Sequence, residues 1–387
     1  MERWFWLDGG GSQEWSGRRS IVGRLAAEDV SLTFDRERGE VVEHPSGEVV
    51  GDDPFAVLQE RLDGDPSTQW VGYFGYAARA DLPARPMPGI PDAVWMRTRD
   101  VQVTEEPRRG LTELPERPPE HTTPDWYADA FAVVQEELHA GNTYEVNLTY
   151  RDEHASDRDP EEVYRRLRTT NPAPYAGLLR HGDTWLLSAS PERFATIDRH
   201  RRLETRPIKG TTPRGATPDE DDALRHRLAT DPKFRAENLM ITDLLRNDLS
   251  MVCEPGTVEV PHLMEVESYA SVHQLVTTVR GHLRDDVGTL DALRALFPAG
   301  SMTGAPKLRT MQVIDRVEDT ARGIYAGAFG WISGDGRADL GVVIRSLFRS
   351  GEGPWLLGTG GGITVHSDVD EEWAETCWKA ARLRAAL

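Results

Sequence analysis

The sequence contains few cysteines and no long apolar run. Two of its 387 residues are cysteines, Cys253 and Cys377, and two isolated thiols provide neither a disulfide framework nor a cysteine zinc site. We interpret both as structural residues in a reducing compartment. No segment approaches the roughly 20 consecutive apolar residues of a membrane-spanning helix, and the N-terminus lacks the pattern of a signal peptide. We therefore expect a cytoplasmic protein that does not bind membranes.

The chain also lacks an excess of positive charge. It has 45 lysines and arginines against 64 acidic residues, a net charge of -19. Nucleic acids and anionic membranes bind basic surfaces, because binding releases counterions. This balance argues against nucleic acid as the main partner, although a local basic pocket is compatible with it. With 39% hydrophobic and 28% charged residues, the composition is that of a chain that folds on its own.

The pattern along the chain predicts an α+β protein. Residues 1–105 contain short apolar runs separated by Gly, Asp and Pro, which is typical of a β-rich region. Residues 106–123 are charged and rich in proline, and we interpret them as a linker. Residues 124–387 alternate strand-like segments, such as "TYEVNLTYR", "TWLLSAS" and "ADLGVVIRSLF", with helix-like ones, such as "AENLMITDLL".

One helix is predicted in detail after the linker. Thr123 is the expected N-cap and Pro124 the first helical residue. The apolar residues then recur at helical spacing until Gly141 ends the run. The residues on this predicted buried face are Tyr127, Phe131, Val134 and Leu138.

A lysine in "RPIKGT" is the first candidate for chemistry. Pro207 stiffens the backbone before Lys209, and Gly210 allows a close approach after it. A solvated ammonium is not nucleophilic, so Lys209 is a candidate nucleophile if it is desolvated. A surface lysine on a turn is the commoner interpretation.

Carboxylates near the C-terminus are the second candidate. Glu372 and Glu375 lie three residues apart and share one face of a predicted helix. Such a pair can bind a hard cation, and Glu237 in "RAENLMITDLL" could supply a third ligand. Acids in a first helical turn also favour the helix dipole without any metal, so both interpretations stay open here.

Glycine segments and one arginine are the third candidate. "FPAGSMTGAPK" and "GTGGGI" would allow backbone amides to approach an anion, or would simply form turns. Arg345 interrupts the apolar strand predicted for "ADLGVVIRSLF". A buried guanidinium needs an anion, which is either a structural carboxylate or a substrate.

Taken together, these segments resemble the chorismate-utilising enzymes. "RPIKGT", "AENLMITDLLRNDL", "EPGTVEVP", "FPAGSMTGAPK", "GAFGWIS", "VVIRS" and "GGGI" with "SDVDEEWAET" are similar, in order, to that family's signatures. The resemblance implies an α+β fold like that of anthranilate synthase component I, with two large packed antiparallel sheets, surrounding helices and an active site in the cleft between the sheets. Residues 124–387 would then form the chorismate-binding catalytic region.

The resemblance also implies roles for residues that match the family's motifs. Mg²⁺ would be held by Glu237, Glu372 and Glu375. The two chorismate carboxylates would be held by Tyr325, Arg345, Lys379 and the amides of Gly360, Gly361 and Gly362. The catalytic positions would be those of Lys209, Gln274 and Thr303.

Lysine in "PIKGT" is similar to family members that form 4-amino-4-deoxychorismate, whereas anthranilate synthases usually have alanine there. In the implied mechanism Lys209 attacks ring carbon 2 as the 4-hydroxyl leaves, and ammonia then adds at carbon 4 and expels the lysine. No amidotransferase domain fits in these 387 residues. The resemblance therefore implies that a separate glutaminase subunit supplies ammonia.

Some positions depart from the family's pattern. Gln274 stands where a histidine general acid is common, and His273 beside it should point to the opposite face of its strand. His366 is close to the metal helix, as a supporting or an exposed residue. Glu145 stands where isochorismate-forming relatives have a water-activating lysine, which argues against hydroxylation. The alternatives are an aminodeoxyisochorismate or anthranilate synthase, and a non-catalytic chorismate-binding paralogue.

Overall fold

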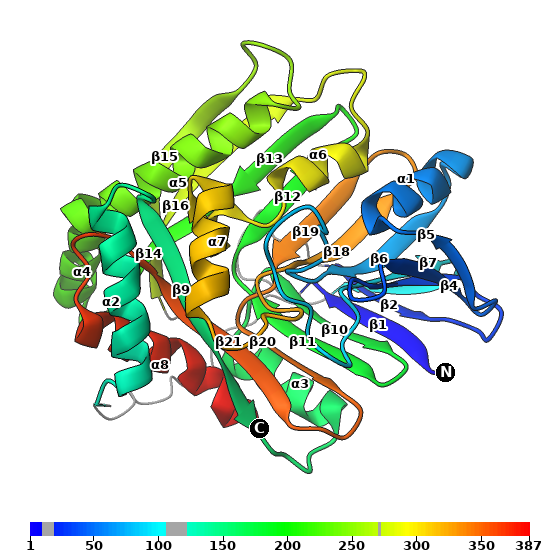
Figure 1. Ribbon diagram of the computed structural model, residues 1–387, viewed down its shortest axis with the longest axis horizontal. Helices are drawn as coiled ribbons and strands as arrows, with labels where there is room; N and C mark the ends of the chain where they lie inside the picture. Colours follow the sequence, from blue (N-terminus) through cyan, green and yellow to red (C-terminus); the bar gives the residue numbers. More distant parts are fainter. Residues whose placement is uncertain (10–18, 106–121, 270–271) are drawn as a thin grey trace.

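Two large antiparallel sheets form the centre of the molecule (Figure 1). The computed structural model describes residues 1–9, 19–105, 122–269 and 272–387. The predicted linker lies outside these ranges, except for Thr122 and Thr123. Strands from the first 105 residues enter both sheets, so the N-terminal region is interleaved with the rest. The boundary between an N-terminal and a catalytic region stays a prediction.

Among the described residues, the first sheet has nine strands. In spatial order they are β17 (Gly304–Ala305), β9 (Glu145–His154), β21 (Trp355–Ile363), β20 (Ser346–Ser350), β11 (Thr184–Ser190), β10 (Tyr175–His181), β1 (Arg3–Asp8), β2 (Arg19–Arg24) and β8 (Val101–Glu105).

The second sheet has twelve strands in the part of the chain that the structure describes. In spatial order they are β14 (Ile208–Pro213), β16 (Val272–His282), β13 (Arg202–Arg206), β12 (Arg193–Ile197), β19 (Ala338–Val342), β18 (Ala328–Ser333), β6 (Gln69–Phe74), β7 (Ala93–Thr98), β3 (Ser31–Asp35), β4 (Glu40–His44) and β5 (Glu48–Gly51), with β15 (Glu259–Ser268) paired to β16.

The core lies between the two sheets, and a second apolar layer lies outside the first sheet. Because side chains alternate along a strand, Leu179 and Leu186 pack toward the twelve-stranded sheet. Their neighbours Leu178 and Leu187 pack outward, in a cluster with α3 (Pro160–Thr170) and α8 (Val369–Ala386). The predicted α+β architecture of two packed sheets is confirmed.

The other helices cover the sheets from outside. They are α1 (Pro54–Gly64), α2 (Asp125–His139), α4 (Pro218–Thr230), α5 (Pro232–Ser250), α6 (Thr289–Leu296) and α7 (Lys307–Val317), with a 3₁₀ turn at Gly300–Met302. Within the described ranges, no helix is long and apolar enough to span a bilayer.

Several helices begin at a capping residue followed by proline. Asp53, Asp159, Thr217 and Asp231 cap α1, α3, α4 and α5, and a proline follows each. Thr123 and Pro124 have the same pattern, but the predicted N-cap is wrong. The Thr123 hydroxyl donates to Asp370 at 2.5 Å instead, and α2 begins at Asp125. The predicted buried face of α2 is confirmed.

Candidate functional site

A pocket of about 120 Å³ lies beside β21, between the two sheets. Most of the residues singled out in the sequence line it, namely Lys209, Glu237, Gln274, Tyr325, Arg345, Gly360, Gly362, Glu375 and Lys379. Thr303, Gly361 and Glu372 are not among the lining residues. The fold therefore brings together side chains that are up to 170 positions apart in the sequence, from Lys209 to Lys379.

The chain changes sheets just before β20, which leaves part of one edge of β21 without a described strand beside it. β19 ends at Val342 in one sheet and β20 begins at Ser346 in the other, so the single strand predicted for "ADLGVVIRSLF" is wrong. Arg345 at the crossing has φ 51°, a left-handed conformation that ends a strand. β20 pairs with β21 only through Leu347 and Phe348. Beyond that point, one edge of β21 faces the pocket.

Two cations lie at this open edge of β21. Lys379 donates to the Gly360 carbonyl at 2.8 Å, and the Gly360 N–H faces the same edge, because both groups of a residue point to one side in antiparallel pairing. Burial, and then the charge of Arg382, lower the pKa of Arg345 to about 10. No acidic residue in the described ranges pairs with the Arg345 guanidinium. This edge is suited to bind carboxylates.

Lys209 reaches the pocket through a β-bulge in β14. Ile208 pairs with Val276 of β16, whereas Thr211 pairs with Gln274, so the register shifts between them. A bulge inserts one extra residue and redirects side chains. Gly210 lies in the bulge with φ 93°, a conformation that favours glycine. The Lys209 side chain is 9% exposed, as a desolvated nucleophile requires.

Carboxylates surround the Lys209 amine. Its Nζ donates to Glu145, in an ion pair, and to the Ser301 carbonyl at 3.5 Å. Burial alone lowers the pKa of the lysine, but the charges of Glu145, Glu237 and Glu192 outweigh burial, so its pKa is raised. Lys209 is therefore an ammonium here, and it must lose a proton before it can act as a nucleophile.

Glu192 also lines the pocket, although no motif in the sequence indicated it. This residue is 5% exposed and accepts a hydrogen bond from the Ser301 hydroxyl. Burial raises its pKa to about 7, against the lowering effects of Ser301, Lys209 and Lys379. A carboxyl group with this pKa is matched to proton transfer at neutral pH. The available signal was an acid two residues after a fully buried strand, "TWLLSAS".

Gln274 and His273 point in opposite directions, as strand alternation predicts. Gln274 is 5% exposed and lines the pocket, and its Oε1 has no hydrogen-bond partner among the described residues. His273 is held away from the pocket, with Nδ1 2.8 Å from Ser268 Oγ and Nε2 3.0 Å from Asp221 Oδ1. His273 therefore does not replace the family's histidine.

The three predicted metal ligands come from α5 and α8. Glu372 pairs with Lys233 at 2.9 Å, and Glu375 pairs with Lys379 at 2.7 Å. Glu237 and Glu375 line the pocket. In the described part of the chain, no three Asp, Glu, His or Cys side chains are grouped as metal ligands. Lys233 and Lys379 thus neutralise the two carboxylates that a metal cation would otherwise neutralise.

The donor set nevertheless fits a divalent cation. Glu237 is 7% exposed, and burial, followed by the charge of Glu145, raises its pKa to about 8, with a further contribution from Glu372. Burial and the charge of Glu375 raise the pKa of Glu372 as well. Buried carboxylates that repel one another are costly without a counter-ion, and carboxylate oxygens are the ligands that Mg²⁺ binds.

Glycines of β21 leave room for side chains from other elements. A Cβ atom on Gly358 would lie 2.1 Å from the Tyr325 ring, and one on Gly362 would lie 2.5 Å from Glu145 Oε1. A larger residue at either position would displace a pocket side chain. The glycine-rich motif therefore has a packing role in addition to its predicted role in anion binding.

Two other residues from the sequence analysis lie outside the pocket. Thr303 is fully buried, and its hydroxyl donates to the carbonyls of Ala299 and Gly300 at 3.2 and 3.3 Å, which stabilises the turn. His366 is exposed. The catalytic role of Thr303 stays a prediction, and its position gives that role no support.

Residues 105–385 match the family model of the chorismate binding enzymes. The chain therefore belongs to this family, and the resemblance that its motifs indicated is confirmed.

Two sequence relatives and one solved structure match the chain over two thirds of its length or more. The chain is 52% identical over 263 residues to an aminodeoxychorismate synthase from Streptomyces griseus, covering 68% of this chain but 36% of the relative. It is 36% identical over 374 residues to aminodeoxychorismate synthase component 1 from Salmonella typhimurium, covering 86% of this chain and 82% of the relative. A solved structure of anthranilate synthase component I from Streptococcus pneumoniae matches with a TM-score of 0.80 and 25% identity, covering 96% of this chain and 93% of that one.

Proposed function

We propose that the chain converts chorismate and ammonia into 4-amino-4-deoxychorismate. The observation that carries this proposal is the buried Lys209 amine, which a bulge directs into a pocket beside a carboxyl group with a pKa of about 7. The names of the Streptomyces and Salmonella relatives support the same activity.

The open edge of β21 binds the two substrate carboxylates in this proposal. Arg345 contributes a guanidinium without an acidic partner in the described ranges, and Lys379 and the Gly360 amide lie at the same edge. Tyr325, whose ring packs on Gly358, also lines the pocket. Charge-assisted hydrogen bonds of this kind favour the two planar carboxylate groups of a dianion such as chorismate.

Glu237, Glu372 and Glu375 would hold Mg²⁺. When bound, the ion would neutralise a substrate carboxylate and polarise the ring toward attack. Lys233 and Lys379 would then release their carboxylate partners. Lys379 would become free to contact the substrate.

The residues of the chain carry the proton and bond changes. Lys209 transfers a proton to Glu145, with which it is in contact, and its neutral amine attacks carbon 2. Both conjugated double bonds of the ring shift, and the bond from carbon 4 to its hydroxyl breaks as Glu192 protonates that oxygen, which leaves as water. Ammonia then adds at carbon 4, the double bonds shift back, and the bond from carbon 2 to the lysine nitrogen breaks, so that the amine leaves neutral and regains its proton from Glu145.

Ammonia comes from a glutaminase partner in this proposal. The Salmonella relative is named component 1, which implies a second component of that enzyme. We expect this chain alone to use free ammonium at high pH, and to use glutamine only when a glutaminase is added. Product formed from glutamine by the isolated chain would contradict this.

The decisive experiment is to incubate the chain with chorismate, Mg²⁺ and an ammonium salt, and to determine which ring carbon carries nitrogen. Nitrogen on carbon 4 supports the proposal. Nitrogen on carbon 2 would instead identify an anthranilate or aminodeoxyisochorismate synthase. Chorismate binding without any product would identify a non-catalytic paralogue.

A further inference from the structure

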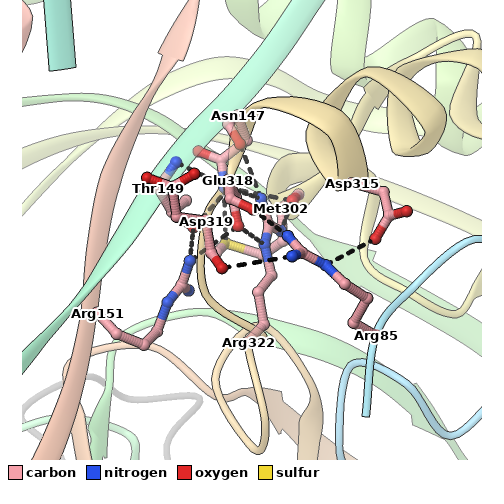
Figure 2. Close-up of polar contacts among 9 residues, drawn as sticks. All are labelled: Arg85, Asn147, Thr149, Arg151, Met302, Asp315, Glu318, Asp319 and Arg322. Carbon is pink, nitrogen blue, oxygen red and sulfur yellow. Dashed lines mark hydrogen bonds and ion pairs between the residues drawn. The ribbon is translucent and has the colours of Figure 1, made fainter. Parts of the chain in front are cut away.

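A buried ion cluster lies next to Asn147 and Met302, which line the pocket (Figure 2). It consists of Arg151 on β9, Glu318 after α7, and Arg322, and we call it the Arg–Glu–Arg cluster. Each of the three side chains is 2% exposed. Glu318 accepts hydrogen bonds from Arg151 at 2.8 Å and from Arg322 at 2.6 and 3.0 Å. The cluster thus holds two buried guanidinium groups with one carboxylate.

Arg322 connects this cluster to two segments of the pocket wall. Its guanidinium donates to the Met302 carbonyl at 2.6 Å and to the Asn147 carbonyl at 2.8 Å (Figure 2). The Asn147 side chain donates to the same Met302 carbonyl at 3.2 Å. Asn147 and Met302 both line the pocket. One guanidinium therefore holds β9 against the 300–302 turn.

The 300–302 turn carries the contacts that matter for the proposed chemistry. The Ser301 hydroxyl donates to Glu192, and the Ser301 carbonyl accepts from Lys209. A displacement of this turn would change the surroundings of the proton donor and of the nucleophile together. The Arg151 guanidinium also lies 5.3 Å from the centre of the Tyr325 ring, so a second pocket residue rests on the cluster.

The cluster also contacts the N-terminal part of the chain. The Arg322 guanidinium lies 4.4 Å from the centre of the Tyr76 ring. Arg85 donates to the backbone carbonyls of Glu318 and Asp319, and pairs with Asp315 at 3.1 Å. Tyr76 and Arg85 precede the segment that matches the family model. The cluster thus joins a part of the chain outside that segment to the pocket wall.

We propose that Arg322 is a positioning residue. It fixes the 300–302 turn against β9 and so keeps Ser301 in hydrogen-bond contact with Glu192 and Lys209. A buried ion pair gives little net stability compared with well-packed apolar residues, whereas a planar guanidinium can fix two carbonyls and a carboxylate at once. This inference rests on the proposed function for its kinetic part. Its structural part is independent of it.

The test compares Arg322→Lys and Arg322→Met with Arg168→Met. Arg168 is a matched control, because its guanidinium donates to buried Asp8 at 2.6 Å and lies outside the pocket. We expect kcat to fall by about 10- to 100-fold in both Arg322 variants, since small misplacements have effects of this size. The KM for chorismate should change by less than about threefold. The control should keep both constants even if its melting temperature falls.

The pH profile gives a readout that loss of stability alone would not move. The Ser301 hydrogen bond lowers the pKa of Glu192, so weakening it should shift the alkaline limb of kcat to higher pH. Lys209 and Lys379, which also lower that pKa, are unchanged in the variants. Ser301→Ala should reproduce the shift of the limb. An Arg322→Lys variant with the parent's kcat and pH profile would overturn the proposal.

Hydrogen exchange tests the structural part without any activity. In Arg322→Lys, amides of residues 299–305 should exchange faster than in the parent, whereas Arg168→Met should leave them unchanged. Unchanged exchange in Arg322→Lys would overturn the positioning role. A parent chain without amination activity, but with the exchange difference, would overturn the proposed function and leave this role supported. If Arg322→Met does not fold, Arg322→Lys and Ser301→Ala decide the outcome.

Discussion

Arg3 and Lys209 are both buried cations, but their surroundings differ. Arg3 is 3% exposed and donates to the carbonyls of Ala26, Ala27 and Asp29 and to the Ser31 hydroxyl, at 2.7 to 3.1 Å. Lys209 instead contacts the carboxylate of Glu145, whose Oε2 has no partner among the described residues.

The difference separates a structural polar network from a functional one. Around Arg3, neutral acceptors satisfy the guanidinium, and such networks make a unique packing rigid. Around Lys209, carboxylates crowd together and a Gln274 oxygen stays unpaired, which leaves capacity for a ligand. Changes near Arg3 should therefore affect stability, and changes near Lys209 should affect chemistry.

The largest effect should come from Lys209→Ala. Amination at carbon 4 should fall by about 10³-fold or more, because the covalent route is lost, while chorismate affinity changes little. With chorismate and no ammonia, intact-protein mass spectrometry of the parent should show an adduct on the peptide that contains Lys209. A variant that makes the product at the parent rate would exclude the lysine from the mechanism.

Glu192→Gln should have the next largest effect, about 10²-fold on kcat, the lower end of the range for a general acid. The parent needs the protonated acid, so its rate should fall as the pH rises through the pKa of about 7. The variant should lose this limb of the profile. A limb that persists in Glu192→Gln would assign the proton transfer to another group.

Glu372→Gln should weaken Mg²⁺ and chorismate binding together, each by about tenfold, because one carboxylate ligand is lost. Calorimetric titration of chorismate with Mg²⁺, and again with a chelator, measures this coupling. Glu371→Gln is a matched control, since Glu371 is the exposed neighbour on the same helix. Binding that is equally tight with the chelator would remove the metal assignment.

The smallest effect should come from His181, in the network around Arg3. Burial, followed by the charges of His44 and Arg3, lowers its pKa to about 3. The folded state favours the neutral His181 ring. The folded protein therefore keeps its full stability above the unfolded pKa of about 6.5 and loses stability as the pH falls below that value. Between pH 7.5 and 5.5 the free energy of unfolding should fall by about 1 kcal/mol for this reason. Urea unfolding at both pH values should show a smaller stability change in His181→Gln, with unchanged activity at pH 7.5.

Local sequence patterns correctly predicted the features that depend only on residues close together in the sequence. The buried face of α2 follows from apolar residues at helical spacing, and Gln274 and His273 diverge because strand side chains alternate. The cap at Thr123 failed because Asp370, distant in the sequence, accepts its hydroxyl. A local sequence pattern cannot predict a contact between residues so far apart in the chain.

Pairing between distant segments of the chain also explains why the change of sheets and the role of Glu192 were not predicted. Arg345 was predicted as a cation that needs an anion, but the change of sheets beside it depends on which strands pair with β19 and β20. Glu192 was missed because a single acid after a strand is usual at a turn. Its pKa is raised by a pocket that is assembled from distant segments.

The pairing of β9 with β21 also determines when the pocket can form. Val146 pairs with Ile363, and Tyr150 with Thr359, so more than half of the chain separates the partners. Contacts between residues so far apart form slowly, because a long loop must close first. During synthesis, Lys209 leaves the ribosome well before β21 and α8 exist. A nascent chain therefore carries it as an ordinary solvated lysine, and its reactivity arises only when folding is complete.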